Sequence, residues 1–206
     1  MTPQDLRRLH RKLERALSTL EDELIADYLT APPTLAINAS ETIATSAYIV
    51  LAHAALEGFF EDLAFWILDR VVTNWTNSRR VSVATACLLL RAAPGVVDDT
   101  GSIFDQVRRA LDAQKATMSR LIRVENHGIS ERHLRSLLGP LGVGLEVATN
   151  PTHIASLSNL ASERGNRAHN NFGATVHVTA SSAKTWVDDC VVLAADMVAH
   201  AIAMRT

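Results

Sequence analysis

The chain has 206 residues, of which 48% are apolar and 20% charged, and its formal charge is −2 at pH 7. This composition is typical of a soluble globular protein and excludes the disordered, collagen-like and disulfide-scaffold classes. Because no overall positive charge attracts polyanions, any site for nucleic acid has to be local. All but three of the cationic residues are arginines, which favours bidentate contacts with phosphate groups.

The cysteines and the N-terminus indicate a cytoplasmic protein. Cys87 and Cys190 each lie in an apolar run without a second cysteine nearby, so we expect neither a CxxC metal site nor a disulfide framework. The N-terminal segment is charged and does not read as a secretory signal. The most apolar stretch, 43–56, is interrupted by His53 and followed by Glu57, so it is too short and too polar to span a bilayer.

Leucines recur every three or four residues in the N-terminal segment, with charged residues between them. This period predicts an amphipathic helix within residues 1–30, which Pro32 and Pro33 end. The next helix, over 39–75, is apolar on nearly all sides, a pattern typical of the central helix of a bundle. The periodic leucines are Leu6, Leu9, Leu13, Leu17, Leu20 and Leu24.

Further helical periods follow along the chain. They cover about 79–91, 104–128, 131–138, 152–170 and 186–198. Ser130 is placed to cap the third of these, which Gly139–Pro140 ends. Residues 174–180 alternate Val176 and Val178 with polar residues, and we expect an extended connector there. No repeat or low-complexity tract interrupts the pattern.

The sequence therefore predicts a single all-α domain over 1–206. It is a bundle of about six or seven helices, with an N-terminal amphipathic helix in 1–30 and a core bundle over 39–204.

The segment 157–172, LSNLASERGNRAHNNF, is the most informative for function. Continuing the apolar face of its helix from Leu157 leads to Arg164, and an arginine on such a face needs a partner, an interface or an anionic ligand. His169 follows five residues later and has a side chain suited to proton transfer near neutrality. Between them, Gly165 leaves room for a phosphate, and Asn166 offers an amide donor.

Spacing alone does not single out this pair. Arg120 and His127 show a similar Arg-x6-His spacing, although they are better explained as a helix end that runs into Gly128. In addition, residues five apart diverge by about 140° on an ideal helix. Arg164 and His169 would therefore have to meet around a ligand or across a subunit interface.

Three segments together resemble the HEPN superfamily, most closely the bacterial RiboL-PSP-HEPN type of domain. They are AHAALEGFFEDLAFWI at 52–67, ENHGISERHLRSLLGPLGV at 125–143 and LASERGNRAHNNF at 160–172. The resemblance covers roughly 45–200 and implies an α-helical bundle whose Arg-x4–6-His motif corresponds to Arg164 and His169. It also implies a homodimer in which both motifs line one composite cleft, and many members are metal-independent endoribonucleases.

The resemblance implies a role for each residue of the motif. His169 would act as general base or acid while a ribose 2′-hydroxyl attacks the adjacent phosphodiester, and Arg164 would clamp that phosphate. Asn166 would orient the phosphate or the hydroxyl, Arg167 would contact the RNA backbone, and Gly165 would let the phosphate approach. The products would be a 2′,3′-cyclic phosphate and a 5′-hydroxyl.

The motif departs from the family pattern at two positions. Gly165 stands directly after the arginine, where many members have a polar residue, so the polar role either shifts to Asn166 or is missing. Asn171 stands where toxins silenced by a partner nucleotidyltransferase have a tyrosine, so we do not expect control by that modification.

A second constellation lies on the central helix. His53, Glu57 and Glu61 are spaced by four and share one stripe, which can be a metal half-site, the far wall of the cleft at Glu57, or a solvent or interface stripe. No glutamate has a histidine three positions later, which excludes a di-iron bundle of the usual kind. The chain contains no nucleotide-binding glycine loop and no GxSxG motif. The remaining histidines are expected on the surface or at helix ends: His10, His127, His133, His153, His177 and His200.

We therefore expect a metal-independent, cofactor-free endoribonuclease that acts as a toxin or anti-phage defence effector. Its expected partners are RNA, a second copy of the chain, and an antitoxin or sensor protein, with no membrane. Two alternatives stay open. One is a catalytically inactive HEPN module that binds RNA or a partner protein through the same face, and the other is a helical adaptor that dimerises through Arg164.

Overall fold

The structure is a computed structural model and describes residues 3–30, 39–92, 101–145, 150–169 and 178–204. These residues form eight α-helices, one π-helical turn and one 3-10 turn, with no strand among them. The all-α prediction is confirmed. These eight α-helices exceed the predicted six or seven because the N-terminal helix is divided in two.

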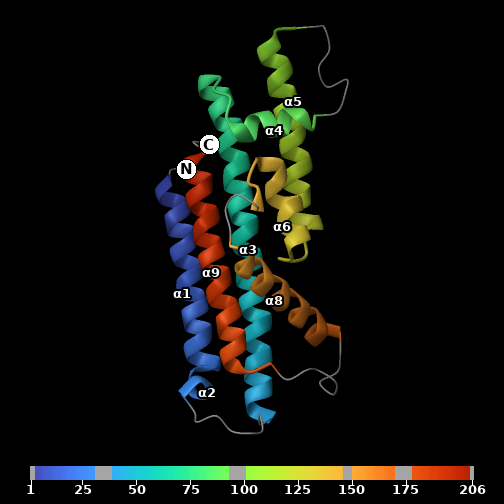
Figure 1. Cartoon of the computed structure of the whole chain (residues 1–206). Coiled ribbons are helices and arrows are strands. Elements are labelled where there is room, and N and C mark those ends of the chain that lie inside the picture. Colours follow the sequence, from blue (N-terminus) through green and yellow to red (C-terminus); the bar gives the residue numbers. More distant parts are fainter. Residues whose placement is uncertain (1–2, 31–38, 93–100, 146–149, 170–177, 205–206) are drawn as a thin grey trace.

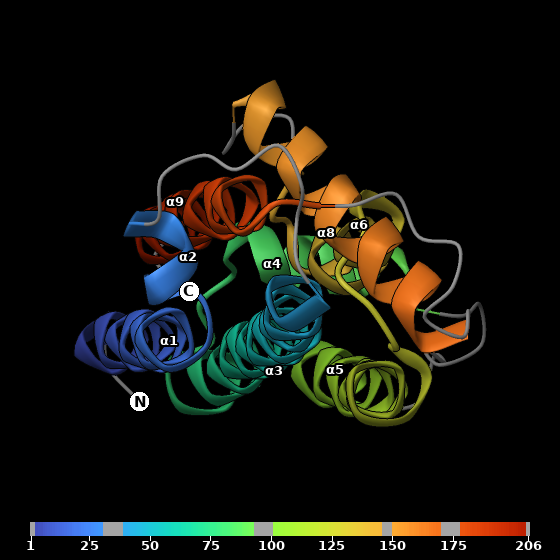
Figure 2. The same cartoon turned by 90° about the horizontal axis from the view of Figure 1, so that it is seen from below.

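The N-terminal segment forms α1 (Pro3–Leu24) and the short α2 (Ala26–Thr30), with the break at Ile25. The leucine period buries Leu6, Leu13 and Leu17 against the core, as the amphipathic pattern predicts. Because Ile25 is itself fully buried, α2 continues the same packing in a new direction. Figures 1 and 2 show α1 beside both α3 and α9.

The central helix α3 (Ala39–Ser78) is the spine of the bundle and contacts most other elements. Its buried side chains include Phe60, Leu63 and Ile67, each without exposed surface, so the prediction of a central helix is correct. It is also the one described helix that is long and apolar enough to cross a membrane by length and composition. Half of its most apolar stretch is packed inside the protein, and the core helix of a soluble protein passes the same test.

The middle of the chain forms α4 (Val83–Leu90), α5 (Ile103–Arg120), the π turn η1 (Leu121–Glu125) and α6 (Glu131–Leu138). Ser82 and Ser102 cap α4 and α5 with their side chains. Ser130 is the N-cap residue of α6, but its hydroxyl bonds to the ring of His133 rather than to a backbone N–H. The predicted end of this helix at Gly139–Pro140 is confirmed, and the chain continues there as the 3-10 turn η2 (Gly139–Leu141).

The last two helices are α8 (Pro151–His169) and α9 (Ala180–Ala203). Most of the predicted extended connector lies outside the described residues, and its described part, Val178 and Thr179, is not a strand. Thr179 instead caps α9. Seen from below, α8 crosses the bundle beside α6, on the side of α3 that faces away from α1 (Figure 2).

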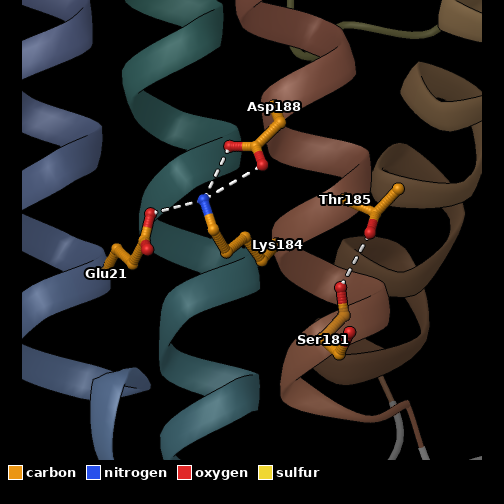
Figure 3. A network of polar contacts seen from close by, with 5 residues as sticks. All are labelled: Glu21, Ser181, Lys184, Thr185 and Asp188. Atoms are coloured by element: carbon orange, nitrogen blue, oxygen red, sulfur yellow. Dashed lines mark hydrogen bonds and ion pairs between the residues drawn. The ribbon is translucent and has the colours of Figure 1, made fainter. Parts of the chain in front are cut away.

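A polar cluster holds α1 and α9 together at the surface. Lys184 of α9 donates to Glu21 Oε2 on α1 at 2.8 Å and to both oxygens of Asp188 at 3.0 Å (Figure 3). Burial alone would lower the pKa of Lys184, but the hydrogen bonds to Glu21 and Asp188 outweigh it, so its pKa is raised. Lys184 therefore stays charged, and the cluster fixes the pairing of the first and last helices.

Candidate functional site

Arg164 lies on the face of α8 that packs against the core. Leu160 and Leu157, one and two turns earlier, are fully buried, and Arg164 itself is half-buried. Within the described part of the chain, its guanidinium makes no hydrogen bond and no ion pair. A half-buried guanidinium without a protein partner is suited to receive an anion.

The next residue, Gly165, borders open space. A Cβ added there would meet no atom of the described structure within 4 Å. The protein itself therefore does not need glycine at this position for packing, and the space at the Cβ position of Gly165 is open.

The stripe of α3 that the sequence singled out lies near Arg164. His53 is 3% exposed, and its Nδ1 is 3.9 Å from Glu57 Oε2. Burial lowers the pKa of His53 to about 4, with smaller contributions from the positive charges of Arg164 and His133. At neutral pH His53 is therefore an uncharged core residue, and the contact with Glu57 is not an ion pair.

Glu57 is the acidic residue that the sequence predicted as the far wall of the cleft. Burial and the neighbouring Glu61 raise its pKa, while Arg164 and His127 counteract this rise. Arg164 thus acts electrostatically on both His53 and Glu57, although it forms no ion pair with Glu57 within 4 Å. The stripe and the arginine form one polar site between α3 and α8.

The segment between η1 and α6 borders the polar site on a third side, after α3 and α8. Asn126 donates from Nδ2 to Glu61 Oε1 at 3.0 Å, and Ser130 Oγ lies 2.7 Å from His133 Nδ1. The ring of His133 packs on Gly128, where an added Cβ would come within 3.0 Å of it. Gly128 therefore allows the close approach that places His133 near His53.

The sequence predicted His127 and His133 on the surface or at helix ends, and His127 is exposed while His133 bonds to Ser130, the N-cap residue of α6, but Asn126 was not singled out. Their roles depend on the turn that brings this segment back against α3. The only signal in the sequence was the run ENHG directly after a helix, with a glycine on which a ring can pack.

Two predicted RNA-contacting residues have protein partners. Asn166 is exposed, and its Nδ2 donates to Glu163 Oε1 at 3.4 Å. Arg167 is 7% exposed and donates to Ser46 Oγ on α3 and to Glu163 Oε2. Arg167 therefore anchors α8 to α3, and this inward position disfavours the predicted contact with an RNA backbone.

His169 is the last residue of α8, and its side chain lies outside the described part of the structure. The predicted pairing of Arg164 with His169 is therefore not tested by the geometry, and Asn171 also lies outside the described residues. Among the described side chains, no group of three or more His, Cys, Asp and Glu residues is arranged to hold a metal ion.

No protein-family model, no curated protein and no solved structure matches this chain. The evidence for a function is therefore the geometry of the candidate site.

Proposed function

We propose that the protein is a metal-independent endoribonuclease of the HEPN type, acting as a toxin or anti-phage defence effector. The observation that supports this most directly is Arg164, a half-buried guanidinium without a partner among the described residues, next to the open space at Gly165. A phosphodiester bound there would lie close to this positive charge.

In the proposed mechanism, Arg164 holds the scissile phosphate and stabilises the charge that develops on its non-bridging oxygens. His169 removes the proton from the ribose 2′-hydroxyl, or donates one to the leaving 5′-oxygen. The 2′-oxygen forms a bond to phosphorus as the bond to the 5′-oxygen breaks, which leaves a 2′,3′-cyclic phosphate and a 5′-hydroxyl. Asn166 orients the phosphate or the hydroxyl, and no metal ion takes part.

The α3 stripe has a supporting role in this proposal. The charges of Glu57 and Arg164 act on each other, and because the two groups form no ion pair within 4 Å, Glu57 leaves the guanidinium available to a phosphate. His53 is buried and uncharged at neutral pH, so it does not serve as the general acid.

The proposal includes a homodimer with a composite cleft. Three large apolar side chains on the N-terminal half of α3 are exposed: Ile43, Val50 and Leu51. They lie within about two turns of Ser46, where Arg167 joins α8 to α3. A second copy covering this surface would bring its own α8 beside the first, which would allow Arg164 of one copy to work with His169 of the other.

The experiment is cleavage of total tRNA and mRNA by the purified protein in EDTA, compared with Arg164→Ala and His169→Ala. We expect cutting by the wild type and a loss of at least about 100-fold in each variant. Arg120→Ala is the matched control, because Arg120 belongs to the other Arg-x6-His pair and lies exposed beside Glu125. A folded, dimeric wild type that leaves RNA intact would favour the inactive binding module, and cutting that His169→Ala leaves unchanged would exclude this site.

A further inference from the structure

A groove of about 950 Å³ lies between α4, α5, α6 and α8 on the described surface. We call it the α6 groove, because most of its polar side chains come from that helix and its N-cap. Its lining residues are Arg91, Gln114, Thr117, Met118, Leu121, Ser130, Glu131, Arg132, Arg135, Ser136, Pro140 and Ser158.

The charge of the α6 groove is positive, although the chain as a whole is slightly negative. Three arginines line it, and its single carboxylate, Glu131, already accepts two hydrogen bonds from Arg135, at 2.9 Å from Nε and 2.7 Å from Nη2. The exposed side chains of Arg91 and Arg132 make no hydrogen bond or ion pair with the described residues. Two guanidiniums are therefore free to bind phosphate groups.

The α6 groove adjoins the candidate site. Ser130 lines the groove, and its hydroxyl is bonded to His133, whose charge acts on His53 in the site. On α8, Ser158 lines the groove and Arg164 follows six residues later, about 9 Å along the helix and about 120° around it. A strand that leaves the groove therefore has to pass around α8 to reach Arg164.

We propose that single-stranded RNA lies in the α6 groove on its way to the candidate site, with its phosphates on Arg91 and Arg132. This inference rests on the proposed ribonuclease function and adds the path by which substrate reaches it. No aromatic residue is among those that line the groove, so it offers no platform for stacking bases. Because the arginines contact phosphates, which carry no sequence information, binding in the groove is tolerant of sequence and strongly dependent on salt.

The test measures binding without cleavage. The probe is a fluorescein-labelled 20-nucleotide RNA in which every ribose is 2′-O-methylated, so that it lacks the attacking hydroxyl. We expect the double variant Arg91→Glu/Arg132→Glu to weaken its binding at least about tenfold at 0.1 M salt and to flatten the dependence of log K on log salt. Because both residues are exposed and make no hydrogen bond or ion pair with described residues, the variant should melt as the wild type does.

The matched control is Arg8→Glu/Arg15→Glu, which reverses two exposed charges on α1, across α3 from the groove (Figure 2). We expect it to bind within about twofold of the wild type. Arg91→Lys/Arg132→Lys, which keeps the charges, should bind RNA nearly as well as the wild type. Equal RNA binding by the two charge-reversal variants would overturn the proposal. A groove variant that no longer binds an acidic protein but still binds the RNA would also overturn it.

The outcome also separates this inference from the proposed function. If the groove variant loses binding but the wild type cuts no RNA, the groove is an RNA site and the ribonuclease proposal fails. If the wild type cuts RNA in EDTA and the groove variant binds and cuts normally, the ribonuclease proposal holds and the groove is not the path.

Discussion

His53 links protonation at the candidate site to the stability of the fold. Its pKa is lowered from an ordinary value of 6.5 to about 4, chiefly by burial. The unfolded chain therefore takes up a proton at this residue between about pH 6.5 and pH 4, where the native protein does not. The free energy of unfolding is at its full value above pH 6.5 and decreases as the pH falls through this window.

The prediction is that His53→Gln flattens the pH profile of stability. For a shift of this size, the wild type should lose about 3 kcal/mol more than the variant between pH 7 and pH 4. Urea unfolding of both proteins at intervals of one pH unit measures the difference. Parallel profiles would mean that His53 is not buried in its neutral form.

A substitution at Gly165 distinguishes a ligand-binding role of α8 from a purely structural role. Because a Cβ at this position meets nothing within 4 Å, Gly165→Ala should raise the free energy of unfolding by about 0.5–1 kcal/mol, the usual gain for alanine over glycine in a helix. The same methyl group occupies the space beside Arg164, so RNA cleavage should fall. Thermal melting and a cleavage assay on one preparation test both effects, and full activity in the variant would show that no phosphate approaches there.

At the scale of residues, the sequence predicted part of the site. An arginine on an apolar face and glutamates spaced by four are visible in the helical period, which is why Arg164 and Glu57 could be chosen. The inward position of Arg167 was not visible, because it depends on Ser46, more than 100 residues earlier in the chain. Contacts of Asn126 and His133 likewise depend on how an irregular segment folds back on α3.

At the scale of elements, α8 is joined to α3 by the hydrogen bond from Arg167 to Ser46, and a partly buried ion pair within α8 holds Arg167 in place. Arg167 Nη2 lies 3.5 Å from Glu163 Oε2, with the two side chains 7% and 15% exposed, and it also donates to Ser46. Removing one partner leaves a largely desolvated carboxylate without compensation, which costs far more than losing a surface pair.

Arg167→Ala should therefore lower the free energy of unfolding by about 2 kcal/mol or more. Arg108→Ala is the matched control, since Arg108 and Asp112 form a pair of the same i,i+4 spacing that is 60% and 56% exposed. We expect that control to cost about 0.5 kcal/mol or less. Chemical denaturation of the three proteins checks the contrast, and equal losses would mean that Arg167 does not anchor α8.

Most helices could be predicted because the hydrophobic period is visible in α1, α5 and α9, and because α3 is apolar on nearly all sides. Two features of the elements could not be predicted from the sequence. The break at Ile25 falls within an uninterrupted leucine period, so only packing of α2 determines it. The π turn at Leu121–Glu125 leaves no mark on composition, yet it ends directly before Asn126 and so positions one wall of the site. Such turns often occur beside functional sites.

At the scale of the whole molecule, the exposed apolar surface of α3 argues for a second copy. Leu51→Glu should convert a dimer to a monomer and abolish cleavage, because a charge in an apolar interface is not compensated. Val192→Glu on α9 is the matched control, since Val192 is 47% and Leu51 46% exposed. Light scattering and RNA cleavage measured together test this, and a monomeric but fully active Leu51→Glu variant would exclude a composite cleft.

The most direct test of the account compares a synthetic RNA with its 2′-O-methyl counterpart, incubated with the protein in EDTA, with product ends identified by mass spectrometry. Attack by the 2′-hydroxyl predicts fragments with 2′,3′-cyclic phosphate and 5′-hydroxyl ends from the RNA, none from its methylated counterpart, and none from RNA treated with Arg164→Ala. Cleavage of the methylated strand, or products with 5′-phosphate ends, would contradict the account.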